Sequence, residues 1–251
     1  MDHHRAAEHL GFAVTSYAEL IAGADLATPV PTCPGWDLRK VTKHVGTVHR
    51  WSTEMVRTRA TERVDTRTLD LDLPATDDGL PAWIESGGRK LVATLDAADG
   101  DDPMWAWGVD QHVRFWSRRM LHETIAHRSD AELALGRQPD VDAMLAVDGI
   151  DELLENLPNA AAFSPEIGKL RGDGESIHLH ATDIEGEWMI DLHADGFTVG
   201  HGHGKGTVAA RGTASDLLLL LYRRADAADE RFTRFGDTAV LDRWVAHTAL
   251  G

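Results

Sequence analysis

The sequence predicts a multi-domain, mainly α protein in which a helical bundle is followed by a small α+β domain. Apolar residues recur at helical spacing from the N-terminus to about residue 157, and short runs separated by turn residues follow Pro158. The 251 residues, 43% of them hydrophobic, suffice for one large domain or two modest ones. We place the boundary near residue 160, which gives domains of residues 1–160 and 161–251.

The first two expected helices cover residues 4–24 and 38–59. Apolar residues of the first recur mostly at steps of three and four, which predicts one buried face: Ala7, Leu10, Val14, Tyr17, Leu20 and Ile21. Three prolines and a glycine exclude helix from residues 28–36, and Asp37 then stands at an N-cap position. The second helix carries His44 in the middle of its apolar face.

Three further helices are expected before Pro158. Residues 61–79 are acidic and lack helical periodicity, which indicates a loop. The three helices are expected at residues 80–96, 111–135 and 140–157, although Gly87 and Gly88 weaken the middle of the first of them. Along the helix at 111–135, one face carries residues at steps of four, three and four: Trp116, Met120, Glu123 and His127.

The last part of the chain is typical of a small antiparallel sheet with two helices. Strands are expected at residues 176–181, 187–192, 196–199 and 207–210. The helices are expected at residues 215–224, with Ser215 as the N-cap, and at residues 238–249.

Composition excludes several classes of function. The net charge of −16, from 41 acidic and 25 basic side chains, repels nucleic acid and anionic lipid, so neither is an expected partner. The strongest apolar run, at residues 217–222, is far shorter than the roughly 20 residues of a membrane span, and the N-terminus does not resemble a signal peptide. We therefore expect a cytoplasmic protein. Because Cys33 is the only cysteine, a metal would have to be held by histidine and carboxylate.

Helix geometry selects one candidate metal site. Glu123 and His127 are four residues apart on an apolar helix face, and His44 faces the same interior from another helix. Two imidazoles and a carboxylate are the usual protein ligands of a catalytic zinc site, and no fourth ligand is evident. Spacing alone leaves a second interpretation open, in which His44 is a hydrogen-bonded core residue and the Glu–His pair lies on a helix surface. The metalloprotease motif H-E-x-x-H is excluded because position 126 is alanine.

Several segments resemble a known family. Residues 33–46 (CPGWDLRKVTKHVG) and 119–132 (RMLHETIAHRSDAE) resemble the signature segments of the mycothiol-dependent maleylpyruvate isomerase family, whose N-terminal part is a DinB-like four-helix bundle. Residues 177–183 (IHLHATD) and 212–224 (GTASDLLLLLYRR) resemble the C-terminal α+β domain of that family. The resemblance implies zinc, or a similar divalent metal, at His44, Glu123 and His127, with mycothiol as the thiol cofactor.

The resemblance also implies that an arginine of the C-terminal domain holds an anionic substrate. Arg224 is our choice as this catalytic residue among five candidates: Arg211, Arg223, Arg224, Arg231 and Arg234.

Several other polar and aromatic residues allow more than one interpretation. Asp130 is either a partner that orients His127 or Arg128, or a solvated residue. The pairs His178/His180 and His201/His203 lack a third metal ligand at a predictable place, His49 points away from His44, and Cys33 has no evident activating base. Five tryptophans either line the pocket or form core: Trp36, Trp51, Trp105, Trp107 and Trp116.

The leading hypothesis is a zinc enzyme that uses a low-molecular-weight thiol against a small electrophile. A thiol at the open metal position would be held as thiolate. Its addition to an activated cis alkene, followed by bond rotation and elimination, would isomerise a maleylpyruvate-like compound, whereas addition alone would be S-transfer; the sequence does not separate the two. The alternatives are a metal-dependent hydrolase and a non-catalytic, metal-carrying protein that binds a small ligand.

Overall fold

The computed structural model describes residues 1–248, and the chain divides into two compact units, Met1–Pro139 and Asp140–Gly251. The predicted fold class is confirmed, since a helical bundle is followed by a smaller unit with a five-stranded sheet. None of the helices within residues 1–248 is long and apolar enough to cross a membrane.

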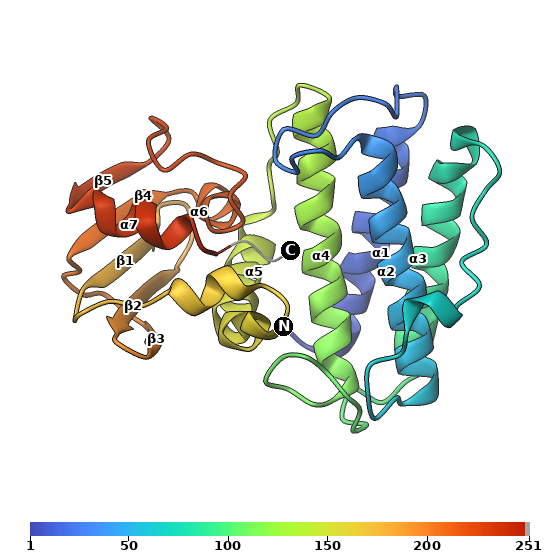
Figure 1. The fold of residues 1–251 in the computed structure, drawn as a ribbon, viewed down its shortest axis with the longest axis horizontal. Coiled ribbons are helices and arrows are strands. Elements are labelled where there is room, and N and C mark those ends of the chain that lie inside the picture. The colour runs from blue at the N-terminus through green and yellow to red at the C-terminus, as the bar shows by residue number, and fades with distance from the viewer. Residues whose placement is uncertain (249–251) are drawn as a thin grey trace. The chain divides into compact units, whose positions relative to one another are not determined.

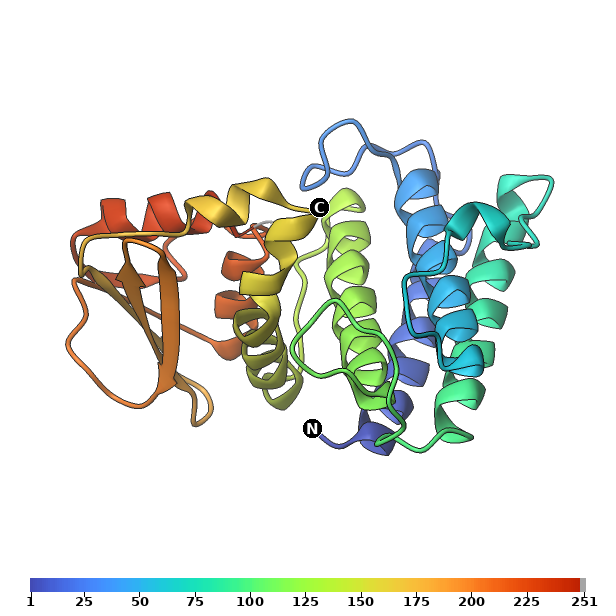
Figure 2. The same cartoon turned by 60° about the horizontal axis from the view of Figure 1, so that its bottom comes forward.

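The first unit is a bundle of four long helices, which run side by side in both views (Figure 1, Figure 2). They are α1 His3–Ile21, α2 Leu38–Thr58, α3 Leu80–Asp96 and α4 Val113–Ala134. Helices α1 and α2 each pack against both α3 and α4. The expected loop at residues 61–79 contains two short 3-10 turns, η1 Thr66–Thr68 and η2 Asp77–Gly79.

Local sequence accounts for the position and packing of α2 and α3. Asp37 caps α2 as predicted, because its side chain accepts a hydrogen bond from the Lys40 backbone N–H. Helix α3 is continuous through its two glycines. A Cβ atom on Gly88 would collide with the side chain of Val14 on α1, so the missing side chain permits close approach of the two helices.

The second unit begins with α5 Ala143–Asn156 and the 3-10 turns η3 Leu157–Ala162 and η4 Pro165–Lys169. The remaining elements are β1 Ser176–Ala181, β2 Glu187–His193, β3 Gly196–His201, β4 Val208–Gly212, α6 Ala214–Leu221, β5 Thr233–Gly236 and α7 Thr238–Val245. The predicted end of the last helix at Ala249 lies outside the described residues.

The boundary between the units differs from the one expected near residue 160. Helix α5 belongs to the second unit, because it packs on α6 and because the Trp188 indole of β2 donates to Asp151 Oδ1 of α5 at 2.6 Å. Ser215 is not the cap of α6. The Thr213 side chain accepts from the Asp216 backbone N–H, whereas the Ser215 hydroxyl oxygen accepts from the Val141 backbone N–H, ahead of α5.

The sheet has the strand order β3-β2-β1-β4-β5 and is mixed, so the predicted antiparallel sheet is wrong in one pairing. Strand β4 lies parallel to β1, whereas the other three pairings are antiparallel. The chain leaves β3 at one edge, and residues 202–207 cross β2 and β1 to reach β4 beyond them. The short strand β5 was not predicted, since its residues Thr-Arg-Phe-Gly do not alternate between buried and exposed side chains.

The two faces of the sheet differ in composition. One face is apolar and fully buried, and includes Ile177 and Leu179 of β1 and Trp188 and Ile190 of β2. Strand alternation places His178 and His180 of β1 and Glu187 of β2 on the other face. The crossing segment, residues 202–207, runs over this polar face.

Candidate metal centre

Helices α2 and α4 bring the three predicted ligands together. His44 lies in the second turn of α2, between the buried core residues Val41 and Val45. Glu123 and His127 lie one turn apart on α4, and α2 packs against α4. The Cβ atoms of all three residues are fixed by regular helix, so the relative positions of the side chains depend on helix packing and not on a loop.

The Glu123 carboxylate lies between the two imidazoles. Its Oε1 is 3.1 Å from His44 Nε2 and 3.3 Å from His127 Nε2. The two imidazole ring centroids are 4.9 Å apart, and one potential ligand atom from each of the three residues lies within 4.8 Å of the others. The His44 side chain is 35% exposed and that of His127 is 13% exposed, so the cluster is open to solvent on the His44 side.

A second set of contacts fixes the orientation of two of these residues. Asp130, fully buried, binds His127 Nδ1 through Oδ2 at 2.8 Å, which leaves Nε2 facing Glu123. The buried Arg119 guanidinium donates from Nη2 to Glu123 Oε2 at 3.1 Å, which leaves Oε1 facing the imidazoles. Each residue therefore presents one atom to the cluster. This arrangement of a carboxylate behind a histidine is common in metal sites.

The loop between α1 and α2 supplies contacts that the sequence did not reveal. The Thr32 hydroxyl donates to Asp130 Oδ1, and Cys33 Sγ lies 3.5 Å from Asp130 Oδ2. Cys33, His127 and Asp130 also have potential ligand atoms within 4.8 Å of one another. The sequence showed no activating base for Cys33, and it is the fold of the proline-rich loop that places the thiol near the His127 imidazole.

The electrostatics of the cluster favour an ion pair. Desolvation raises the pKa of Glu123, but hydrogen bonds from His127 and His44 outweigh it and hold this pKa well below its ordinary value. Desolvation lowers the pKa of His127, but hydrogen bonds with Asp130, Cys33 and Glu123 raise it well above its ordinary value. Without a metal, the centre therefore holds an ionised Glu123 beside a protonated His127.

The predicted tryptophans divide into one residue at the centre and four elsewhere. Trp36 contacts the His44 ring edge-on at a centroid distance of 5.4 Å, and Lys40 Nζ lies 4.6 Å from the Trp36 ring centroid. Trp51, Trp105 and Trp116 contact one another, and Trp107 packs on Phe115. Trp36 is thus the tryptophan that lines the cluster, and the other four pack among aromatic side chains.

His49 and Arg224 are not among the residues that present ligand atoms to this cluster. His49 is fully buried on α2, and its Nε2 lies 2.8 Å from Thr124 Oγ1. Arg224 belongs to the second unit, where its Nη1 donates to the Tyr222 backbone oxygen at 2.6 Å and where it lines a surface pocket with Arg223 and Asp242. The substrate-holding role of Arg224 stays a prediction.

Comparisons with known proteins cover nearly the whole chain. Residues 8–132 match the model of the mycothiol maleylpyruvate isomerase N-terminal domain, and residues 144–243 match the C-terminal domain of the same enzymes. A crystal structure of the mycothiol-dependent maleylpyruvate isomerase is 13% identical, with 93% of each chain covered and a TM-score of 0.59. A structure of a histidine-to-alanine mutant of that isomerase has the same identity and coverage and a TM-score of 0.58. No curated protein sequence matches the chain.

Proposed function

Because the chain belongs to the mycothiol-dependent maleylpyruvate isomerase family, we propose that it is a zinc enzyme that uses a low-molecular-weight thiol, mycothiol, to isomerise or to conjugate a small electrophile. The observation that carries this proposal is the convergence of His44, Glu123 and His127. Two imidazoles and one carboxylate are the donor set of catalytic zinc sites that keep a position open.

The residues present fit a divalent metal. Glu123 Oε1, His44 Nε2 and His127 Nε2 face one another, and Asp130 and Arg119 occupy the other binding atoms of His127 and Glu123. A zinc ion held there, when bound, would supply the positive charge that keeps a nearby thiol deprotonated near neutral pH. The donor set also suits related divalent transition metals.

The chain's own residues prepare the site for a thiol. Asp130 fixes the His127 ring so that its Nε2 faces the cluster, and Arg119 fixes Glu123. The Trp36 indole beside His44 gives the exposed side of the centre an apolar wall that restricts water. These positions are set before any ligand arrives, so little reorganisation is needed on binding.

The thiol accounts for both proposed reactions. When bound, it would supply a sulfur nucleophile for a cis alkene conjugated to a carbonyl, and reversible addition of that sulfur would allow conversion to the trans alkene. Addition without elimination would be S-transfer. We assign Arg224 to the binding of an anionic substrate.

The test is turnover and metal content in matched variants. We expect zinc in the purified protein, loss of one zinc equivalent and of activity in His44→Ala and Glu123→Gln, and neither loss in His9→Ala, which removes a partly exposed histidine of α1. Mass spectrometry of the reaction with mycothiol and a panel of maleylpyruvate-like and other electrophiles distinguishes isomer from conjugate.

Two outcomes would contradict the proposal. Turnover that is undiminished without any thiol would favour a hydrolase that uses metal-activated water. Ligand binding without turnover of any panel member would favour a non-catalytic binding protein.

A further inference from the structure

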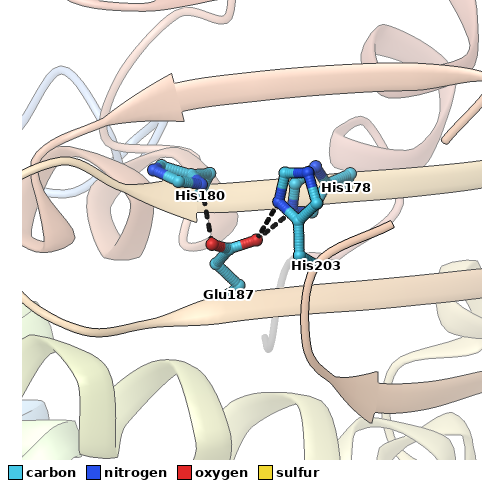
Figure 3. A group of neighbouring side chains, drawn as sticks. All are labelled: His178, His180, Glu187 and His203. Carbon is cyan, nitrogen blue, oxygen red and sulfur yellow. Dashed lines mark hydrogen bonds and ion pairs between the residues drawn. The ribbon is translucent and has the colours of Figure 1, made fainter. Parts of the chain in front are cut away.

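A second group of histidines and a carboxylate lies on the polar face of the sheet in the second unit, and Figure 3 shows it. His178 and His180 extend from β1, Glu187 extends from β2, and His203 lies on the crossing segment, residues 202–207. One potential ligand atom from each of these four residues lies within 4.8 Å of the others.

Strand register brings three of the four residues together. His178 and His180 are two residues apart, so both point to the same face of β1. Glu187 is the direct cross-strand partner of His180, which places the carboxylate beside both imidazoles. The regular sheet therefore fixes three donors, two imidazoles and a carboxylate, with no need for a loop.

The crossing segment adds the fourth donor. Gly202, at φ +128°, turns the chain after β3, and its backbone N–H donates to the Glu187 backbone oxygen at 3.1 Å. This turn places His203 over the sheet, with its ring 5.2 Å from that of His178. The His203 side chain is 78% exposed, whereas that of His178 is 6% exposed, so the donors range from buried to accessible.

The Glu187 carboxylate contacts all three imidazoles. Its Oε2 lies 2.9 Å from His178 Nε2 and 2.8 Å from His203 Nδ1, and its Oε1 lies 3.1 Å from His180 Nδ1. Tetrahedral zinc, with bonds of about 2.0–2.1 Å, holds its ligand atoms about 3.3 Å apart. The separations of the Glu187 oxygens from the imidazole nitrogens are close to that value. One ligand atom of each of the four residues lies within 4.8 Å of the others, so small side-chain movements, above all of the exposed His203, complete the shell.

The charge of the group also suits a cation. Desolvation raises the pKa of Glu187, but hydrogen bonds from His203 and His178 outweigh it and hold this pKa below its ordinary value. The carboxyl group is therefore ionised. One contact opposes a cation, since Arg211 Nη2 lies 3.4 Å from His180 Nε2. A metal at Nδ1 requires a proton on Nε2, so the exposed Arg211 side chain has to turn away.

We propose that His178, His180, Glu187 and His203 form a second metal site that binds a divalent transition ion of the zinc class. Three imidazoles and one carboxylate complete a tetrahedral shell, so the site is closed and structural. It fastens the crossing segment to β1 and β2, which covers the polar face of the sheet. The site lies within the second unit and its existence does not depend on the proposed thiol chemistry.

Calorimetric titration of the metal-free full-length chain with Zn²⁺ tests the proposal. All samples carry His44→Ala and Glu123→Gln, which disable the first centre. We expect one equivalent of zinc to bind this background. Addition of His203→Ala weakens binding at least tenfold, because it removes a ligand from an exposed position that leaves the fold intact. Addition of His201→Ala leaves binding unchanged, because this neighbouring side chain, 68% exposed, lies outside the group.

Hydrogen exchange gives an independent readout. Zinc should slow amide exchange in residues 202–207 of the background variant and should not do so in the His203→Ala form. The proposal is overturned if the background variant binds no zinc, or if His203→Ala and His201→Ala bind it equally. It is also overturned if zinc binds without protecting the crossing segment.

Discussion

Lowering the pH should destabilise the folded protein through His49. Its Nε2–H donates to the Thr124 hydroxyl, which itself donates to the Met120 backbone oxygen at 2.7 Å. Within the described residues, His49 Nδ1 is buried without a hydrogen-bond partner. A proton on Nδ1 would therefore place an unpaired charge in the core, and desolvation lowers the pKa of His49 from 6.5 to about 3.

The magnitude follows from this shift. Because the pKa is lowered by folding, the unfolded chain takes up a proton at His49 as the pH falls below 6.5, and the folded chain does so only near pH 3. Stability is therefore complete above pH 6.5 and is lost progressively below it. At about pH 5, roughly 1.5 pH units below 6.5, a cost of about 1.4 kcal/mol per unit gives a loss of about 2 kcal/mol.

Urea denaturation of the wild type and of His49→Gln at about pH 7.5 and about pH 5 measures this loss. Glutamine keeps an N–H donor for Thr124 but does not titrate. The wild type should lose about 2 kcal/mol more unfolding free energy between the two pH values than the variant does. Other titrating groups are common to both proteins and cancel in this difference. Equal losses in the two proteins would refute the reasoning, because His49 would then accept its proton in the folded state.

Three further predictions concern the metal centre and the bundle. Asp130→Asn should weaken zinc binding in calorimetry about 10- to 100-fold, because the carboxylate that orients His127 loses its charge; an unchanged affinity would mean that Asp130 does not support a ligand. Because the pKa of His127 is raised, metal has to displace its proton, so zinc affinity should rise about tenfold per pH unit near neutrality; a flat profile would exclude this coupling. Gly88→Ala should lower the unfolding free energy, since overpacking against Val14 costs about 1–3 kcal/mol. The matched Gly11→Ala, whose Cβ would meet only Val92 Cγ2 at 3.9 Å, should raise it by about 0.5–1 kcal/mol, and stabilisation by both changes would contradict the packing argument.

The sequence predicted best what depends on helix periodicity. The third helix was predicted at residues 80–96 and is found at Leu80–Asp96, because its apolar face is packed along its length. The same periodicity selected His44, Glu123 and His127, since each interrupts an apolar helix face. Residues on regular helices at known spacing can be placed on a common side without knowledge of the tertiary path.

What the sequence did not predict depends on the paths of irregular segments. Thr32 and Cys33 reach Asp130 across 98 and 97 residues, and no local pattern reports such a contact. His203 joins His178 and Glu187 because the chain crosses the sheet to pair β4 with β1 in parallel. Strand alternation showed His178 and His180 on one face of β1. The other two proposed ligands, Glu187 and His203, join them only through the pairing of the strands, which alternation does not encode.

The two groups contain similar donors, but the partners of each carboxylate give them different roles. At the first centre, Arg119 occupies Glu123 Oε2 and Asp130 occupies His127 Nδ1, so three residues present one atom each. At the second, both oxygens of Glu187 face imidazoles, and His203 supplies a fourth ligand. Under our two proposals, an ion in the bundle keeps a position for a thiol, whereas an ion on the sheet has none. Loss of the second site should therefore release the crossing segment and leave thiol chemistry in the first unit unaffected.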